Sequence, residues 1–309
     1  MSTVAIVMTT YNGEKYIEEQ IKSILSSLYQ DFTLYIFDDG STDSTLSILE
    51  YFKESYPDKV NVIRNISNYG VTMNFIQALT KMTVEYIMFS DQDDVWLPNK
   101  IGISLKRMKQ MEAQFSKEYP IAVFTDAHVV DHNLSTINPS FFRSGHLDPG
   151  KTDLAHLLME NKLIGCTVMV NAALRRKLQS NRLPRHARYH DWWIALIAAS
   201  FGKIGFVKES TLLYRQHGNN MVGDTGFITY IKNRITNLQL QREALRALYR
   251  QAEDFINIYG GQLDEDTREI IRRFSALGEL GFAKRRIEAV RCGYLKSGLL
   301  RNIGLMLIL

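Results

Sequence analysis

The sequence contains few of the residues that mark specialised classes of protein. Of its 309 residues only two are cysteine and six are proline, while 45% are hydrophobic and 23% are charged. This composition excludes a disordered, collagen-like or polytopic membrane chain and indicates a globular protein. Cys166 and Cys292 are too few for a disulfide framework or a structural zinc site, so a reducing compartment is expected. The length predicts one large domain, or a principal domain with an appendage.

Three further features are missing. The first residues, MSTVAIVMTTYNG, lack the basic stretch, long apolar core and cleavage site of a secretion signal, so none is expected. No GxGxxG follows the first apolar run, which argues against a dinucleotide-dependent dehydrogenase. The net charge of +4 is concentrated in 284–309, which carry six basic residues and one acidic residue. No basic recognition face is present elsewhere, and nucleic acid is therefore not an expected partner.

The first third alternates apolar runs with helical periodicity. The predicted strands are Val4–Met8, Leu34–Phe37, Val60–Ile63 and Tyr86–Phe89. A helical pattern follows each of them. Such runs linked by helices indicate a parallel sheet covered on both faces, with ligand-binding loops gathered where the strands end.

The rest of the chain divides into two parts. The middle predicts strands at Ile121–Phe124, Thr167–Val170 and Leu212–Tyr214, with helices after Thr152 and over Trp192–Ala199. From Thr225 onward only three or four helices are predicted, broken near Gly260-Gly261 and Gly293. We expect residues 1–223 to form one domain, with halves at about 1–125 and 126–223, and residues 224–309 to form a helical region.

Polar segments follow three of the early strands. They are Thr9-Thr10-Tyr11-Asn12-Gly13, Asp38-Asp39-Gly40-Ser41-Thr42-Asp43 and Ser90-Asp91-Gln92-Asp93-Asp94. Turns and helix caps explain Ser41, Thr42 and Asp43. Three carboxylates within four residues repel one another, and such a cluster generally requires a cation. Oxygen ligands suit Mg²⁺ or Mn²⁺, so a metal is preferred here over a helix cap.

These segments, together with His190-Asp191-Trp192-Trp193, resemble family 2 glycosyltransferases of the GT-A fold. The resemblance covers about Val4 to Gly223. The HDWW segment and the later stretch from Tyr214 to Asn220 are similar to those of the bacterial rhamnosyltransferase branch. The resemblance implies an α/β fold, with a Rossmann-like mixed sheet flanked by helices and a C-terminal helical appendage.

The resemblance also implies roles for individual residues. It places Thr10, Tyr11 and Asn12 against the nucleotide base, Asp39 on the imide N–H of that base, Asp91 near the ribose, and Asp93 on the Mg²⁺ or Mn²⁺ ion. It identifies Asp191 as the general base of an inverting enzyme, the alternative being a helix N-cap. The Trp192-Trp193 pair is then expected to shield Asp191 from water. His190 receives no catalytic role, because many relatives have Glu-Asp where this chain has His-Asp.

His217 and Arg215 have two interpretations each. His217 is either a further metal ligand or a surface group, and Arg215 is either a phosphate contact or a solvated strand residue. Asp94 either belongs to the metal-binding cluster or caps the helix toward Lys100. Cys166 is expected to be a small buried packing residue, since no activating partner is evident.

The implied reaction transfers L-rhamnose from dTDP-β-L-rhamnose to a lipid-linked (polyprenyl-diphosphate) or growing polysaccharide at the cytoplasmic face of the cell membrane. A UDP-hexose donor remains an alternative, and a non-catalytic nucleotide-sugar-binding scaffold is a third. The apolar end of the chain, Leu299–Leu309, is too short to span a bilayer. With its basic neighbours it predicts either an anionic membrane contact or docking on the catalytic domain or on a second subunit.

Overall fold

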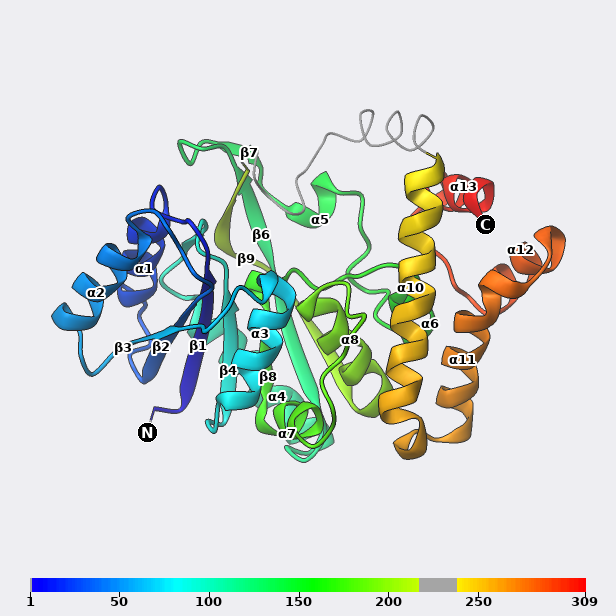
Figure 1. Cartoon of the computed structure of the whole chain (residues 1–309), viewed down its shortest axis with the longest axis horizontal. Helices are drawn as coiled ribbons and strands as arrows, with labels where there is room; N and C mark the ends of the chain where they lie inside the picture. Colours follow the sequence, from blue (N-terminus) through cyan, green and yellow to red (C-terminus); the bar gives the residue numbers. More distant parts are fainter. Residues whose placement is uncertain (1, 217–237) are drawn as a thin grey trace.

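The computed structural model describes residues 2–216 and 238–309. Within them a single mixed sheet has nine strands in the order β3-β2-β1-β4-β8-β6-β9-β5, with β7 paired to β6. Helices pack around this sheet, and a group of C-terminal helices lies beyond it (Figure 1). The predicted α/β fold with a C-terminal helical region is confirmed.

The first half of the sheet is parallel and follows the predicted strand–helix alternation. Its strands are β1 (Val4–Thr10), β2 (Phe32–Asp38), β3 (Val60–Arg64) and β4 (Tyr86–Ser90), and its helices are α1 (Ile17–Leu25), α2 (Thr45–Ser55) and α3 (Gly70–Lys81). In the register, Thr10 lies opposite Asp38, and Met8 lies opposite Ser90. The polar segments after β1, β2 and β4 therefore leave the same edge of the sheet, as the sequence predicts.

The second half is mixed. It contains β5 (Val95–Trp96), β6 (Ile121–Val130), β7 (Thr136–Asn138), β8 (Met169–Asn171) and β9 (Lys203–Arg215). β8 is antiparallel to both β4 and β6, whereas β9 is parallel to β6. The predicted strand over Thr167–Val170 is only partly correct, because Gly165–Thr167 form a 3₁₀ turn (η1) before β8 begins. That turn brings Cys166 to the edge where the first-half loops gather.

The helices of the second half cover the sheet and lead to the C-terminal region. They are α4 (Lys100–Phe115), α5 (Phe141–Ser144), α6 (Leu154–Met159), α7 (Ala172–Gln179) and α8 (His190–Phe201). The C-terminal region contains α10 (Leu238–Tyr259), η2 (Gly260–Gln262), α11 (Glu265–Ser275), η3 (Ala276–Glu279), α12 (Phe282–Arg291) and α13 (Leu299–Ile308). The predicted breaks near Gly260 and Gly293 are confirmed. The predicted boundary near Gly223 lies outside the described residues.

The C-terminal helices share a hydrophobic core with the sheet-bearing part of the chain. Figure 1 shows α8 lying between the sheet and α10. Trp193 of α8 is fully buried, and its ring lies 5.2 Å from that of Phe255 and 6.2 Å from that of Tyr259, both on α10. Burying such large rings stabilises the contact by several kcal/mol, on the order of 2 per side chain. Among the described helices, none combines the length and the apolar character needed to cross a membrane.

Candidate active site

The loops after β1 and β2 are tied together by a buried carboxylate. Oδ2 of Asp38 accepts a hydrogen bond from Thr10 Oγ1 at 2.9 Å, and its Oδ1 accepts the backbone N–H groups of Gly40 and Ser41. The backbone N–H of Asn12 donates to Ser41 Oγ at 2.9 Å. The turn roles expected for the DDGSTD segment are confirmed for Ser41. Thr10 therefore has a structural role in this loop through its hydrogen bond to Asp38.

Tyr11 is the aromatic residue of the first loop, and it is exposed, as is Asn12. The Tyr11 side chain is 50% exposed, whereas Thr10 is buried. Both backbone polar groups of Tyr11 are paired with the Gln92 side chain, the N–H at 3.0 Å and the carbonyl at 3.2 Å. Gln92 therefore joins the first loop to the acidic loop after β4, a contact that sequence analysis missed. The exposed phenol ring remains available for stacking on a planar ligand.

Asp39 lies at the N-terminus of α3. Its carboxylate accepts the backbone N–H groups of Tyr69 and Gly70 at 2.8–3.1 Å and the Asn65 side-chain N–H at 2.8 Å. A carboxylate in this place satisfies unpaired helix donors and complements the helix dipole. Both oxygens of Asp39 therefore already accept protein N–H groups. A hydrogen bond from a nucleotide base to Asp39 would add a further donor to one of them.

The acidic loop after β4 brings two carboxylates together with a thiol. Ligand atoms of Asp91, Asp94 and Cys166 all lie within 4.8 Å of one another, the one such group identified among the described residues. Asp94 is 1% exposed, while Asp91 and Asp93 are half-buried. The alternative in which Asp94 caps α4 is wrong: Asn99 occupies the N-cap position, and Oδ1 of Asp94 accepts the Arg215 backbone N–H at 3.2 Å. The partly exposed carboxylates are the ones that a ligand can reach.

Burial and mutual repulsion disfavour the charged forms of these groups. Burial, and then the carboxylates of Asp94, Asp93 and Asp191, raise the pKa of Asp91 well above its ordinary value. Burial, followed by repulsion from Asp93, raises the pKa of Asp94 to about 7. Burial raises the pKa of the Cys166 thiol well above its ordinary value too, and the nearby carboxylates add to the effect. The thiol is therefore protonated and is no nucleophile, which agrees with the predicted packing role of Cys166.

Arg215 at the end of β9 holds the acidic loop in place. Its Nε donates to the Asp93 carbonyl at 2.9 Å, and its guanidinium forms an ion pair with Glu19 of α1 at 2.5 Å. The side chain is 2% exposed, so the expectation of a solvated strand residue is wrong. The other expected partner of Arg215, a phosphate, is not tested by these contacts.

Asp191 lies in the first turn of α8 and faces the acidic loop. The N-cap of this helix is Tyr189, so the N-cap alternative for Asp191 is wrong. Its Oδ1 accepts the backbone N–H of Trp192 at 2.6 Å. Burial raises the pKa of Asp191 to about 7, although contacts from Trp192, Asn161 and Gly165 favour the charged form. The same carboxylate contributes to the raised pKa of Asp91, which indicates that the two groups share one site.

The neighbouring His190 is a packing residue. Its ring stacks on Phe75 at 3.9 Å between centroids and makes an edge contact with Phe89 at 5.4 Å. Burial lowers its pKa to about 3, so the ring is neutral at pH 7. Leaving His190 without a catalytic role agrees with this environment.

The remaining residues of the HDWW segment anchor α8 to other elements. The Trp192 indole N–H donates to the Leu157 carbonyl of α6 at 2.5 Å, and Trp193 packs on α10. The preceding loop is held by α10 as well, since Asp254 accepts the backbone N–H groups of Arg185 and His186. Both tryptophans are therefore engaged elsewhere, which gives them an anchoring role besides the predicted shielding of Asp191. His217, the other predicted metal ligand, lies outside the described residues.

Comparison with known proteins connects this geometry with a family. The profile described as "Glycosyl transferase family 2" matches residues 5–178. The dTDP-rhamnosyl transferase RfbG of Shigella flexneri is 31% identical over 227 residues, which cover 70% of this chain and 73% of that protein. The putative teichuronic acid biosynthesis glycosyltransferase TuaG of Bacillus subtilis is 25% identical, over 71% of this chain and 81% of that protein.

Solved structures with the same fold are more distant in sequence. TarS 1–349 of S. aureus in complex with UDP-GlcNAc has a TM-score of 0.57 at 16% identity, over 94% of this chain and 79% of that one. The mannosyltransferase PcManGT from Pyrobaculum calidifontis, in complex with GDP-Man and Mn²⁺, has a TM-score of 0.54 at 16% identity, over 99% of this chain and 87% of that one. With a family profile that matches more than half of its residues, this chain belongs to glycosyl transferase family 2.

Proposed function

We propose that the protein is an inverting, divalent-metal-dependent glycosyltransferase that uses Asp191 as its general base. The observation that carries the proposal is that Asp191 lies beside the acidic loop. Its Oδ2 is 3.5 Å from the position of a β-carbon on Gly165, and the sulfur of the next residue, Cys166, lies within 4.8 Å of ligand atoms of Asp91 and Asp94. A carboxylate whose pKa is raised to about 7 faces the acidic loop at the carboxyl edge of the sheet. A base with a pKa near neutrality accepts a proton efficiently at physiological pH.

The acidic loop suits a hard divalent cation such as Mg²⁺ or Mn²⁺. Carboxylate oxygens are the ligands these ions prefer, whereas a protonated thiol is not, so Cys166 is an unsuitable ligand. Asp93 is the proposed metal ligand because its side chain is accessible, unlike that of Asp94. A cation bound there would also relieve the repulsion that raises the pKa values of Asp91 and Asp94. When bound, the ion stabilises the negative charge of the departing diphosphate. His217 is proposed as a second ligand from its family motif alone.

The nucleotide is proposed to lie across the loops after β1, β2 and β4. The exposed ring of Tyr11 supports stacking on the base, with Thr10 and Asn12 shaping the loop beneath it. Asp39 is proposed to accept the base N–H, and Asp91 is proposed to lie next to the ribose. The acceptor oxygen then attacks the anomeric carbon on the face opposite the diphosphate, and the bond to the diphosphate breaks. Asp191 accepts the proton of the attacking hydroxyl, and attack from that face inverts the anomeric configuration.

The proposed donor is dTDP-β-L-rhamnose. The name of the Shigella flexneri relative, a dTDP-rhamnosyl transferase, supports this choice at 31% identity. Inversion would then produce an α-L-rhamnosyl linkage on a polyprenyl-diphosphate-linked or growing polysaccharide. A UDP-hexose is the second candidate, since the complex of TarS contains UDP-GlcNAc. The perturbed carboxylates argue against a non-catalytic scaffold, because buried acidic groups with raised pKa values are typical of active sites.

The C-terminal region is proposed to contact an anionic membrane surface, with residues 1–223 forming the catalytic domain. Helix α13 buries Leu305 and Ile308 against the protein, which agrees with the docked-helix alternative for one face. Its other face exposes Leu299, Leu300, Ile303 and Leu307, each 50–76% exposed. Helix α13 contains no acidic residue. The basic residues nearest to this stripe are less exposed than the sequence suggests, since Lys296 is buried and Arg285 and Arg286 are half-buried. The apolar stripe therefore carries the proposed membrane contact, and a second subunit is the alternative partner.

Two substitutions test this function. Asp191→Asn is expected to abolish sugar transfer while dTDP binding in the presence of Mn²⁺ is retained. Asp93→Ala is expected to weaken Mn²⁺-dependent dTDP binding. Screening dTDP-β-L-rhamnose and UDP-hexoses for Mn²⁺-dependent thermal stabilisation identifies the donor, because a ligand stabilises the folded state that binds it. Transfer by Asp191→Asn at the wild-type rate would contradict the proposal.

A further inference from the structure

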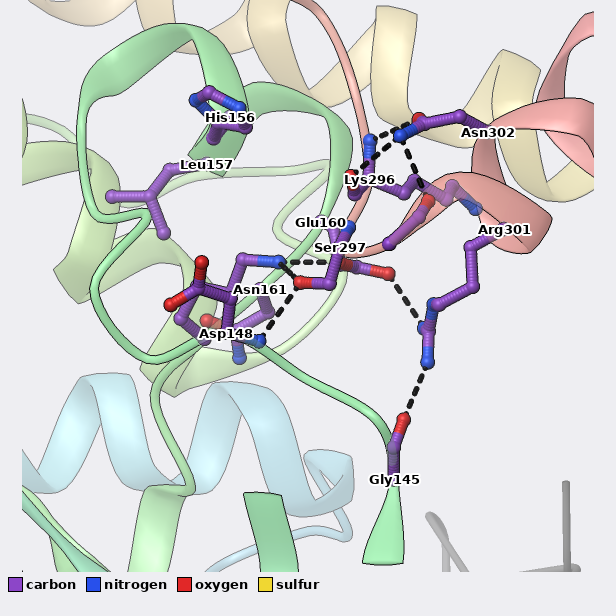
Figure 2. Close-up of polar contacts among 12 residues, drawn as sticks. Gly145, Asp148, His156, Leu157, Glu160, Asn161, Lys296, Ser297, Arg301 and Asn302 are labelled. Atoms are coloured by element: carbon purple, nitrogen blue, oxygen red, sulfur yellow. Dashed lines mark hydrogen bonds and ion pairs between the residues drawn. The ribbon is translucent and has the colours of Figure 1, made fainter. Parts of the chain in front are cut away.

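A buried cluster of side chains joins the C-terminal region to the segment beside Asp191. We call it the 160–301 cluster and define it as Glu160, Lys162, Ser297 and Arg301. The Arg301 guanidinium pairs with Oε1 of Glu160 at 2.5 Å, and the Lys162 ammonium pairs with Oε2. Lys162 also donates to Ser297 Oγ at 2.5 Å, and the Ser297 backbone N–H donates to Glu160 Oε2 at 2.8 Å. Figure 2 shows Arg301 lying between Glu160 and the Gly145 carbonyl.

Three of the four members of the cluster are buried, and the Arg301 side chain is 13% exposed. Glu160, Lys162 and Ser297 are 6%, 1% and 1% exposed. Arg301 donates to the Gly145 carbonyl at 2.8 Å, and the Asp148 backbone N–H donates to Ser297 Oγ at 3.0 Å. Loss of one partner would leave a buried charge uncompensated. The cluster thus fixes three distant chain segments relative to one another: 145–148, 160–162 and 297–301.

The segment held by this cluster contacts the first turn of α8 at two points. At one end, the Leu157 carbonyl accepts the Trp192 indole N–H at 2.5 Å. At the other end, the position of a β-carbon on Gly165 lies 3.5 Å from Oδ2 of Asp191. Between them, the Asn161 side chain bonds to both backbone polar groups of Leu163, at 3.1 and 2.9 Å. Residues 157–165 therefore form a continuous connection from the cluster to Asp191.

We propose that the 160–301 cluster positions residues 157–165 against α8, so that Glu160 and Arg301 act as positioning residues for Asp191. The inference rests on the proposed role of Asp191 as general base. Arg301 is connected to Asp191 through this segment, so it acts as a positioning residue and not as a catalytic one. A displacement of about 1 Å in a reacting group can lower the rate by about 100-fold, so small shifts of the segment matter.

The contact to Trp192 gives a direct spectroscopic test. The chain has only three tryptophans, so a ¹⁵N-labelled sample gives three indole resonances, and Trp192→Phe assigns the relevant one. In Arg301→Gln we expect the Trp192 indole resonance to move while that of Trp96, which lies in β5, stays in place. Arg301→Lys restores the charge and is expected to move the resonance back toward its wild-type position. The matched control is Arg291→Gln, which removes an exposed ion pair to Glu288.

Turnover supplies the second readout. With dTDP-β-L-rhamnose, Mn²⁺ and water as the acceptor, hydrolysis yields rhamnose and dTDP, and Arg301→Gln is expected to release dTDP about 10- to 100-fold more slowly than the wild type. Its affinity for dTDP should stay within about twofold, because the nucleotide loops lie on other elements. Arg291→Gln should match the wild type in both measurements. This split between turnover and nucleotide affinity separates positioning from a general loss of stability.

A folded Arg301→Gln protein with unchanged Trp192 resonance and unchanged turnover would overturn the inference. Should Arg301→Gln fail to fold, Ser297→Ala tests the same cluster without changing its charge, and the same two outcomes apply. The spectroscopic arm needs no donor, so it decides the positioning even if dTDP-β-L-rhamnose is not turned over. The proposed function fails separately, through an active Asp191→Asn.

Discussion

Nε2 of His190 lies 2.8 Å from the position that a β-carbon would take on Gly165. The same position is 3.5 Å from Oδ2 of Asp191, so Gly165 lies directly against the base of the proposed reaction. His190 cannot move away easily, because its ring is stacked on Phe75 at 3.9 Å. The absence of a side chain at residue 165 is therefore required for the close packing of η1 on α8.

Gly165→Ala is expected to displace the first turn of α8 and to reduce turnover by about tenfold or more, with a stability loss of about 1–3 kcal/mol from overpacking. Turnover and the denaturant midpoint of unfolding measure the two effects. Gly102→Ala in α4 is the control, because a β-carbon there meets no other atom within 4 Å. Equal behaviour of the two variants would contradict the close-packing argument.

The rate of transfer should depend on pH through Asp191. Burial raises its pKa to about 7, and only the deprotonated carboxylate accepts a proton. We therefore expect kcat to fall by about tenfold per pH unit below about pH 7 and to level off above it. The measurement uses saturating Mn²⁺ and donor, so that protonation of Asp91 and Asp94, which also have raised pKa values, does not limit binding. A profile that is flat from pH 5 to 8 would exclude Asp191 as the base.

The 160–301 cluster should make the protein sensitive to acid. Burial works against the charged form of Glu160, but the Lys162 and Arg301 charges lower its pKa to about 2 from 4.5. Because the folded-state value is the lower one, this stabilisation is complete above about pH 4.5 and is lost as the pH falls toward 2. It amounts to at most about 3 kcal/mol at neutral pH, counting about 1.4 kcal/mol per unit of pKa. Burial lowers the pKa of the partner Lys162, which offsets part of this stabilisation.

Glu160→Gln should therefore lower the free energy of unfolding at pH 7 by about 3–5 kcal/mol, because it leaves buried positive charges unpaired. The difference from the wild type should shrink as the pH falls below 4. Denaturant unfolding at several pH values measures both effects. Glu269→Gln is the control: the pKa of Glu269 is also lowered to about 2, by bonds to Arg272 and Arg273, but this carboxylate lies at the surface and its loss should matter much less. A comparable loss in both variants would show that burial of the cluster is unimportant.

The parts of the fold that the sequence predicts are those with local signals. Apolar runs followed by Asp- and Thr-rich loops predicted β1, β2 and β4 and the shared edge where their loops meet. β5 and β7 were missed because two- and three-residue strands carry no periodicity. Most of β9 was missed because Gly205 interrupts its first apolar residues, and Lys208-Glu209-Ser210 separate them from the apolar run Leu212–Tyr214. These strands depend on neighbours rather than on their own composition.

The same distinction between local sequence signals and long-range contacts applies to the candidate site. Asp191 and the acidic loop were identifiable from motifs, but the partners that hold them were not. Gln92, Arg215 and the 160–301 cluster act through contacts between residues far apart in the chain, such as Glu160 with Arg301. A single sequence gives no signal for such pairs, since each residue alone resembles an ordinary surface group.

The exposed stripe on α13 leads to the last prediction. Replacing Leu299, Ile303 and Leu307 with serine should weaken binding to vesicles that contain anionic lipid by about tenfold or more, since each side chain contributes about 1 kcal/mol when buried in the interface. The three side chains are 50–76% exposed, so the fold should be unaffected.

Deleting residues 284–309 is a poor test of the membrane contact, because it also removes Ser297 and Arg301 from the buried cluster. The control is Leu28→Ser with Ile66→Ser, two apolar residues elsewhere that are 77% and 98% exposed. Vesicle cosedimentation measures the binding, and sedimentation velocity without lipid tests the alternative: loss of a dimer in the serine variant, with unchanged vesicle binding, would assign the stripe to a second subunit.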